Sequence, residues 1–274
     1  MEHNDHVTES WDNGTGLAGT IWHAPNPRGN VLLQHGFAEY SKRYVTQYAH
    51  LIPKLNEAGL SVYANDLHGH GESPGKRRDV DLLKSIDSHL LARESIGTEL
   101  PLFLFGHSLG GAVTAGSIMR NQRNVLGAVL SGPALIRLPS GLSAMLGKAG
   151  HRWPMMPIKG LAPNAMTQSK AILAAVNDDP MMCRGWMPLG LIGSLCIAND
   201  ALWQHVDQWH VPILLVHGSR DKYTQPRDSK RFVQRIGTTD KALNIVEGGF
   251  HETYNDPGGE ILADQTVQWM LQRL

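Results

Sequence analysis

Short runs of apolar residues alternate with amphipathic stretches along most of this chain. Strand-like apolar runs occur at residues 31–33, 61–64, 101–105, 125–130, 211–216 and 243–246. Between them, helical spacing of apolar residues is found at 44–58 (with Gly59 as the C-terminal cap), about 82–90, 110–119, 232–236 and 258–274. Because the central strands are apolar on both faces, the pattern predicts an α/β fold, a mostly parallel sheet with helices on both faces. Ligand sites in such sheets lie beyond the carboxyl ends of the strands.

The alternation breaks between about Leu135 and Asp207. This stretch lacks strand-like runs, and prolines divide it into short pieces. We therefore predict an α/β core formed by residues 1–134 and 208–274, and a helical cap, or lid, inserted at 135–207. The insertion holds seven of the ten methionines, Met145, Met155, Met156, Met166, Met181, Met182 and Met187. Because thioethers pack around varied shapes, these methionines are expected to line an adaptable apolar pocket, with an ordinary helical core as the alternative.

The pattern Gly106-His107-Ser108-Leu109-Gly110 directly follows an apolar strand and precedes a helix. It matches the G-x-S-x-G nucleophile elbow, in which a sharp strand-to-helix turn strains the serine backbone and exposes its hydroxyl at the end of the sheet. The helix N-terminus at Ser108 also favours negative charge that develops there. Ser108 is therefore predicted to be a catalytic nucleophile.

A serine hydroxyl is a weak nucleophile and needs a base that a third group orients. In folds with this elbow the order is serine, acid, histidine, with the acid after a late strand and the base after the last one. Asp221 and His251 occupy these two positions. Asp207, before the late strand, and Asp228, in the helix expected after it, are the competing acids. The sequence therefore predicts a triad of Ser108, Asp221 and His251.

The tetrahedral intermediate of acyl transfer also needs backbone donors. We expect one to be the N–H of Leu109, the residue after the nucleophile, and the other to be the N–H of Phe37, in the loop after an early strand. In the same loop, His35 and Gly36 are expected to shape the turn. Glu39 is expected to accept hydrogen bonds from loop amides, which is a structural role.

Composition narrows the class of protein further. The 274 residues are 42% hydrophobic and 18% charged, as in ordinary globular domains. Lys and Arg together number 25, as do Asp and Glu, so no basic excess favours nucleic acid or an anionic membrane. Cys183 and Cys196 are too few for a disulfide framework and are expected to be buried apolar residues. The polar start has no signal-peptide pattern and no apolar run is long enough to span a bilayer, which makes a cytoplasmic location the expectation.

Two further patterns resemble ligand motifs but lack the context that those motifs require. Residues 14–19 fit G-x-G-x-x-G, yet no apolar strand precedes them and no helix follows. A β-hairpin turn is therefore predicted there in place of a nucleotide site. His68-Gly69-His70-Gly71 has no nearby set of Cys, Asp or His to complete a metal site, so loop structure is expected and no metal is predicted.

Three segments of the chain resemble monoglyceride lipases. HGFAEY at 35–40, followed by Arg43-Tyr44, is similar to their H-G-x-x-E-H…R-Y segment, DLHGHGES at 66–73 to their D-x-R-G-H-G-x-S loop, and GHSLGG at 106–111 to their G-H-S-M-G-G elbow. The resemblance extends from about Trp22 to Leu274. It implies an α/β-hydrolase that cleaves monoacylglycerols, or in related members lysophospholipids, without a cofactor. It also implies that an apolar cap admits the acyl chain and touches membranes, and it carries over the same triad and oxyanion donors.

The chain departs from the family pattern at three positions outside the triad. His68 stands where Arg is usual, Leu109 where Met is common, and Tyr40 where His is common. Tyr40 lies near the expected acyl entrance, so this departure bears on the substrate and not on the chemistry.

Together these features predict a serine esterase or lipase that hydrolyses single-chain acyl esters, with monoacylglycerols as the expected substrates. Lysophospholipids, short-chain esters and thioesters are alternative substrates, and peptidase or carbon–carbon hydrolase chemistry also suits the fold. Outside enzymes, the alternative is a catalytically silent ligand receptor on the same fold. The expected partner is a small acyl ester, with peripheral membrane contact through the cap left open and no nucleic acid.

Overall fold

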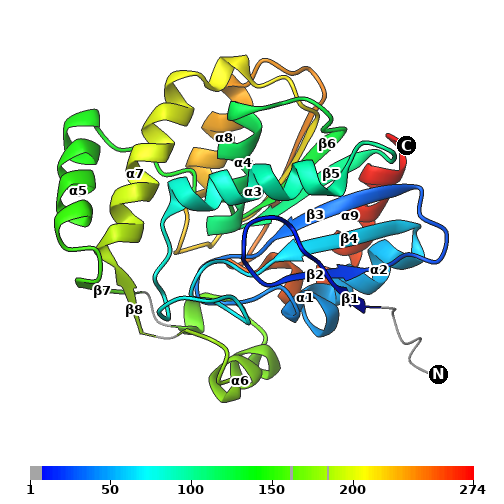
Figure 1. Ribbon diagram of the computed structural model, residues 1–274, viewed down its shortest axis with the longest axis horizontal. Coiled ribbons are helices and arrows are strands. Elements are labelled where there is room, and N and C mark those ends of the chain that lie inside the picture. The colour runs from blue at the N-terminus through cyan, green and yellow to red at the C-terminus, as the bar shows by residue number, and fades with distance from the viewer. Residues whose placement is uncertain (1–7, 161–162, 184) are drawn as a thin grey trace.

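A single eight-stranded sheet forms the centre of the computed structural model, which describes residues 8–160, 163–183 and 185–274 (Figure 1). The strands, in their order across the sheet, are β1 (Thr8–Ser10), β2 (Gly19–Trp22), β4 (Leu60–Asn65), β3 (Gly29–Gln34), β5 (Leu102–His107), β6 (Gly127–Ser131), β9 (Ile213–Gly218) and β10 (Lys241–Val246). Strand β2 pairs antiparallel with β1 and β4, and all neighbours from β4 to β10 are parallel. The predicted mostly parallel sheet is confirmed.

Helices cover both faces of the sheet, as the doubly apolar strands require. Alternate residues of β5 face opposite sides, so Phe103 and Phe105 belong to one buried cluster and Leu102 and Leu104 to the other. The first cluster includes side chains of α1 (Arg43–Thr46), α2 (Leu51–Glu57) and α9 (Gly259–Leu271). The second includes side chains of α3 (Leu82–Ile96), α4 (Leu109–Arg120) and α8 (Pro226–Arg235).

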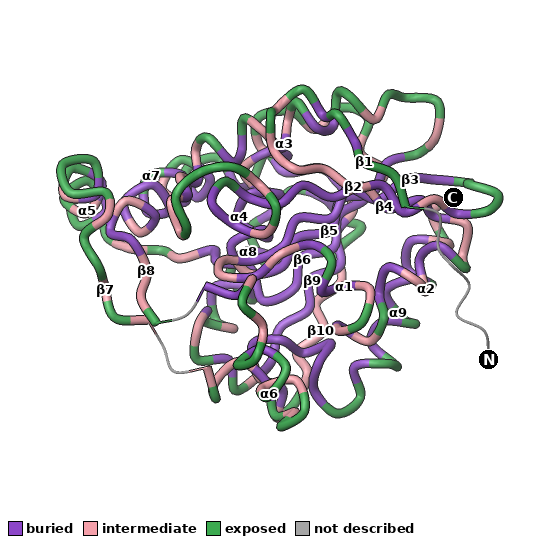
Figure 2. Tube along the Cα trace, turned by 60° about the horizontal axis from the view of Figure 1, so that its bottom comes forward, coloured by how far each residue is buried: buried purple, intermediate pink, exposed green. Residues whose placement is uncertain are grey.

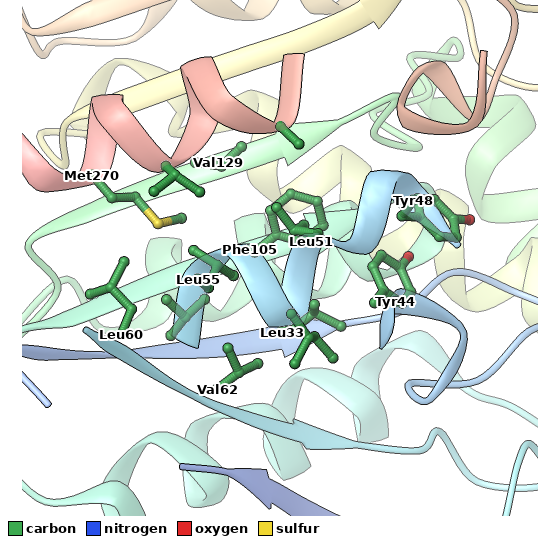
Figure 3. Packing of buried hydrophobic residues seen from close by; sticks show 14 of the residues in the cluster. Leu33, Tyr44, Tyr48, Leu51, Leu55, Leu60, Val62, Phe105, Val129 and Met270 are labelled. Atoms are coloured by element: carbon green, nitrogen blue, oxygen red, sulfur yellow. The ribbon is translucent and has the colours of Figure 1, made fainter. Parts of the chain in front are cut away.

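Figure 3 shows the first cluster at close range, where Leu33, Phe105 and Val129 of the sheet meet Tyr44 and Met270 of the helices. Leu33, Phe105 and Val129 are fully buried. Removing a side chain of this size from water contributes about 1.5–3 kcal/mol. This packing makes the sheet a rigid platform, and the residues that follow its carboxyl ends are held in fixed positions.

The predicted continuous helix over 44–58 is wrong. The chain instead forms α1, then three residues with left-handed φ (Tyr48, Ala49 and His50), and then α2. Pro53 gives the reason, because its ring clashes with the carbonyl four residues earlier and it has no N–H to donate to that carbonyl. The helix therefore restarts at Leu51, which places Pro53 in the first turn of α2, where a proline is tolerated.

The G-x-G-x-x-G pattern at 14–19 spans the end of the connection between the antiparallel strands β1 and β2 and the first residue of β2, which confirms the predicted hairpin. His68 and His70 lie in loop structure, also as predicted, and His68 Nδ1 is 2.7 Å from the carbonyl oxygen of Asp79. Within the described ranges, no three or more His, Cys, Asp or Glu side chains come together in a way that could hold a metal ion.

The described part of the stretch 135–207 contains the α-helices α5 (Ser140–Arg152), α6 (Lys170–Asp178) and α7 (Leu189–Gln204), with a short 3₁₀ helix at Pro163–Ala165. It also contains β7 (Pro157–Lys159) and β8 (Trp186–Pro188), which pair antiparallel as a separate two-stranded sheet. The expectation that this stretch lacks strands is therefore wrong, and three-residue strands containing proline are too short to give an alternating pattern. Helix α5 packs on α7 at the edge of the molecule, and much of α5 is exposed (Figure 2). None of the helices that the structure describes is both long and apolar enough to cross a membrane.

Candidate active site

Ser108 lies in the sharp turn between the end of β5 and the start of α4. Its backbone has φ +53° and ψ −116°, a conformation that costs a non-glycine residue about 1–3 kcal/mol. Hydrogen bonds from the Ser108 N–H to Ser131 O (2.9 Å) and from the Ala134 N–H to Ser108 O (2.9 Å) hold this turn against the neighbouring strand. Gly106 allows the turn, because a Cβ at that position would lie 2.5 Å from Gly110 O. The strained elbow that the sequence predicts is present.

The three residues predicted as a triad meet at the carboxyl ends of β5, β9 and β10. His251 Nε2 lies 2.8 Å from Ser108 Oγ, and His251 Nδ1 lies 2.7 Å from Asp221 Oδ2. The two competing acids are elsewhere, Asp207 in a short 3₁₀ turn and Asp228 in α8. With Nδ1 donating to Asp221, Nε2 of His251 is free to accept the proton of the Ser108 hydroxyl.

The Asp221 carboxylate is held by more donors than the sequence indicated. Oδ1 accepts hydrogen bonds from the N–H groups of Tyr223 (2.7 Å) and Thr224 (3.0 Å), and Oδ2 lies 2.7 Å from the Thr224 hydroxyl. His217 Nε2 lies 3.1 Å from the same Oδ2. Burial alone would raise the pKa of Asp221, but His251 and His217 outweigh it and hold this pKa well below its usual range. Asp221 is therefore ionised throughout the physiological range.

The environment of His251 suits a general base. Burial lowers its pKa, the Asp221 carboxylate more than compensates, and the net pKa is raised above the ordinary value of 6.5. The Tyr223 ring stacks on the imidazole at 4.9 Å between centroids, and the His107 ring lies 4.9 Å away on a tilted plane. Burial lowers the pKa of His107 to about 4, so this neighbour is neutral and adds no positive charge beside His251.

The loop after β3 lies directly against the nucleophile. A Cβ on Gly36 would come within 3.1 Å of Ser108 Cβ, so a larger residue there would press on the elbow. His35 Nδ1 is 2.7 Å from Gly36 O, and its Nε2 accepts the N–H of Leu67 at 2.9 Å, so Nδ1 is the protonated nitrogen and donates to that carbonyl. In a trans peptide the carbonyl oxygen and the next N–H point in opposite directions. The His35 bond therefore fixes the direction of the Phe37 N–H, the predicted oxyanion donor.

Glu39 accepts the N–H of Gly36 at 2.7 Å, which confirms its predicted structural role. The sequence pattern does not indicate the other hydrogen bonds and ion pairs of Glu39. Arg43 Nη1 lies 2.5 Å from Glu39 Oε2 and 3.0 Å from Glu252 Oε1, and all three side chains are buried. Arg43 thus joins the loop of Phe37 to the residue next to His251, across more than 200 positions of sequence.

A mainly apolar cavity of about 330 Å³ opens onto Ser108 and His251. Phe37 and Leu109, the predicted oxyanion donors, are in its wall. Residues from the 135–207 stretch form much of the rest, among them Leu138, Leu146, Met166, Val176, Met182, Trp186, Met187, Leu191 and Leu195. Only three of the seven methionines predicted to line a pocket do so, and Met145 (58% exposed) and Met156 (49% exposed) lie on the outer surface. Both cysteines are buried and free, as predicted, and both line this cavity.

Two direct bonds tie the stretch over the cavity to the loop of Phe37. The Tyr40 hydroxyl donates to Asp179 Oδ2 at 2.8 Å, and the Cys183 N–H donates to Ala38 O at 2.9 Å. Burial and the Asp179 carboxylate raise the pKa of Tyr40 to about 12, so its hydroxyl keeps its proton. Tyr40, one of the three positions at which the chain departs from the family pattern, therefore contacts the 135–207 stretch, which lines the cavity.

The sequence pattern gives no role in the site to three residues that contact Asp221, namely His217, Tyr223 and Thr224. His217 stands four residues before Asp221 in a strand that is apolar on both faces, and a lone histidine in such a strand reads as a buried structural residue. The available signal of its role was its position as the next-to-last residue of the strand that precedes Asp221. Thr224 and Tyr223 follow Asp221 in a loop whose path the sequence pattern does not fix.

The strained serine, the base that it meets and the buried carboxylate behind that base, placed on one edge of this sheet, define a serine hydrolase of the α/β-hydrolase class. A family model described as serine aminopeptidase, S33, matches residues 25–258. The chain belongs to this family, within which it is monoglyceride lipase-like.

Named relatives agree with this placement. The monoacylglycerol lipase of Mycolicibacterium smegmatis is 31% identical over 257 residues, which cover 91% of this chain and 90% of the relative. The human monoglyceride lipase is 27% identical over 242 residues, which cover 84% and 77% of the two chains. The crystal structure of Paleococcus ferrophilus monoacylglycerol lipase superposes with a TM-score of 0.83 at 30% identity, covering 94% of this chain and 99% of that one.

Proposed function

We propose that this enzyme is a monoacylglycerol lipase that hydrolyses a single-chain acyl ester through a Ser108 acyl-enzyme. One observation carries the proposal: the Ser108 hydroxyl meets His251 at 2.8 Å on the floor of a cavity of about 330 Å³ whose walls are mainly apolar. A cavity of this size and character suits one acyl chain, with the ester carbonyl beside the serine. Relatives and a solved structure named as monoacylglycerol lipases support the choice of substrate.

In the proposed reaction, His251 Nε2 takes the hydroxyl proton as Ser108 Oγ attacks the ester carbonyl. Asp221 keeps the His251 proton on Nδ1 and stabilises the imidazolium that forms. The alcohol, glycerol for a monoacylglycerol, leaves with the proton from Nε2, and the acyl group stays on Ser108 as an ester. Water then attacks this acyl-enzyme with the same histidine as the base and releases the fatty acid.

The oxyanion of each tetrahedral intermediate is assigned to the N–H groups of Phe37 and Leu109. Leu109 is the first residue of α4, so its N–H lies at the positive end of the helix dipole. The Phe37 N–H is directed by the His35–Gly36 hydrogen bond described above. Removing one such donor typically costs 10²–10³ in turnover, so the rigidity of this loop bears directly on rate.

The charges of the cavity wall favour an ester over a peptide with a free amino terminus. An aminopeptidase site needs an unpaired carboxylate for the substrate ammonium. Glu39 and Glu252, the carboxylates in the wall of this cavity, both pair with Arg43. Among the described lining residues, neither carboxylate is therefore available to an amine, which supports acyl ester hydrolysis within a family described by its aminopeptidases.

We further propose a cytoplasmic enzyme that contacts membranes peripherally through α5 and its surroundings. Large apolar side chains are exposed there, namely Leu142, Met145, Trp153, Met156 and Ile197. Lys148 and Arg152 lie among them in the sequence, and cations near an anionic leaflet add about 1 kcal/mol each. This surface lies on the same stretch of chain that lines the cavity onto which Ser108 opens, so we expect a substrate held in a bilayer to enter from this side.

A hydrolysis panel tests the proposed substrate. Monoacylglycerols of increasing chain length are compared with lysophospholipids, short-chain esters and acyl thioesters, and Ser108→Ala serves as the inactive control. We expect the highest kcat/KM for a monoacylglycerol and no turnover by the control. Preference for esters of two to four carbons would overturn the lipid substrate, and preference for lysophospholipids would reassign the head group. A wild-type enzyme inactive on the whole panel would favour a ligand receptor.

A further inference from the structure

His217 contacts the catalytic acid directly, yet the reaction described above gives it no role. It is in β9, one residue from the end of the strand, and its side chain is fully buried. Its Nε2 lies 3.1 Å from Asp221 Oδ2, the oxygen that also meets His251 Nδ1 at 2.7 Å. Its Nδ1 lies 2.7 Å from the Ser229 hydroxyl of α8. Two imidazoles therefore share one carboxylate oxygen.

The surroundings of the ring fix which nitrogen carries the proton. Nε2 faces the Asp221 carboxylate, the Thr224 carbonyl oxygen at 3.4 Å and the Thr224 hydroxyl at 3.2 Å, whose own proton goes to the closer Asp221 Oδ2 at 2.7 Å. If Nε2 carried a lone pair, that pair would face an ionised oxygen at 3.1 Å, which is repulsive. With the proton on Nε2, Nδ1 accepts the hydroxyl proton of Ser229. The ring is thus locked as an Nε2–H donor to Asp221, with Ser229 as its anchor.

We propose that His217 is a positioning residue of the hydrolase, whose Nε2–H holds Asp221 Oδ2 in place and competes with His251 for its charge. The inference rests on the proposed function, since it concerns the acid of that triad. A second donor on Oδ2 draws electron density away from the His251 contact. The carboxylate then stabilises the His251 imidazolium less strongly, which keeps the base neutral, and therefore active, at lower pH.

Other charged and titratable groups also face the two rings, so the test must separate their effects. Asp228 of α8 lies near His217, as does Asp221 itself. The groups that act on His251, from the strands and loops packed against it, are Asp221, Glu252, Glu39, His107 and Tyr223. A substitution that changes only the tip of the side chain at position 217 leaves all of these charged and titratable groups in place.

Two amide variants differ only in reach. The side chain of His217→Gln is long enough to present an N–H where Nε2 stood, whereas that of His217→Asn ends near Nδ1 and keeps only the Ser229 side. The kcat/KM of each is measured from pH 5 to 9 by pH-stat titration of a water-soluble acyl ester. For His217→Asn we expect the acid limb to move to higher pH by about one pH unit, because the unshared carboxylate raises the pKa of His251. For His217→Gln we expect the acid limb to lie at the same pH as in wild type.

The pH of the acid limb in the two variants distinguishes a positioning role of His217 from one in which it only fills space. If neither variant moves the acid limb, or both move it equally, His217 only fills space and the proposal is overturned, even if both variants lose kcat. Should His217→Asn not fold, as judged by near-ultraviolet circular dichroism, Ser229→Ala replaces it. This variant removes the anchor on Nδ1 and should shift the limb in the same direction by less, and an unmoved limb overturns the proposal. Failure of the proposed function looks different, because wild-type hydrolysis would then be absent or would survive in Ser108→Ala.

Discussion

Replacing Arg43 by methionine removes the cation that two buried carboxylates share. Methionine fills a similar length without charge, so Glu39 and Glu252 are left buried and unpaired. Both carboxylates are almost fully buried, at 3% and 2% exposed, and water cannot take the place of the guanidinium. Breaking a buried ion pair from one side typically costs 3–5 kcal/mol, because the remaining charge is uncompensated.

The pKa of Glu252 gives a second, independent value for the stability that the Arg43 ion pairs contribute. Burial raises this pKa, but Arg43 outweighs burial and holds it at about 2, against an ordinary 4.5. A depression of this size contributes about 3 kcal/mol of stability at neutral pH. Because the folded pKa is depressed, that stability is present above pH 4.5 and is lost as the pH falls toward 2. In Arg43→Met the strongest influence that lowers the Glu252 pKa is gone, so burial raises this pKa relative to wild type, and the penalty on stability shrinks when the carboxyl is protonated.

Urea unfolding at pH 7 and pH 4 measures both effects. At pH 7 we expect Arg43→Met to lose about 3–5 kcal/mol in the free energy of unfolding, with a fall in Tm of about 10 °C. At pH 4 the free energies of unfolding of Arg43→Met and wild type should differ by less, because Glu252 of the variant is then more often protonated. Arg120→Met is the control, because its partner Asp87 and Arg120 itself are exposed, and its expected loss is below about 1 kcal/mol. If Arg43→Met loses no more stability than Arg120→Met, or if the loss is the same at pH 4 as at pH 7, Arg43 does not compensate the two buried carboxylates.

Four further outcomes follow from the site. Because Asp221 raises the pKa of His251, the acid limb of the wild-type kcat/KM profile should lie above pH 6.5, and a limb well below 6.5 would contradict the assignment of the base. Asp221→Asn should lower kcat about 10³–10⁴-fold with little change in KM, measured on a soluble ester, since the amide no longer fixes the tautomer. Leu195→Trp in the cavity wall should reduce turnover of long-chain monoacylglycerols more than that of a butyrate ester; equal losses would place the acyl chain elsewhere. Trp153→Ala should weaken flotation with anionic vesicles, whereas Leu91→Ala, an exposed leucine on α3, should not.

Much of the fold could be predicted from the sequence because the central strands are buried on both faces. Such strands appear as continuous apolar runs, and the turns after them must carry the polar residues. This is why the sequence pattern brings Ser108, Asp221 and His251 to one edge of the sheet, and why the elbow glycines are informative.

The remaining features depend on forces that a periodic pattern does not record. The helix break at Tyr48–His50 comes from Pro53, a single side chain inside otherwise regular helical spacing. Strands β7 and β8 exist only because each pairs with the other. Arg43, Glu252 and His217 acquire their roles from partners that are distant in the sequence, and each in isolation is an ordinary charged or aromatic residue. The methionines of the 135–207 stretch divide between cavity and surface according to the side to which each backbone segment turns, which side-chain type alone does not determine.

Labelling with a fluorophosphonate, followed by peptide mass spectrometry, shows whether Ser108 is an activated nucleophile. The reagent reacts only with a serine whose hydroxyl is activated by a base and whose oxyanion is stabilised. We expect one adduct per chain, on the peptide that contains Ser108, and none in Ser108→Ala or after acid unfolding. An unlabelled folded protein, or an adduct on another residue, would contradict this expectation.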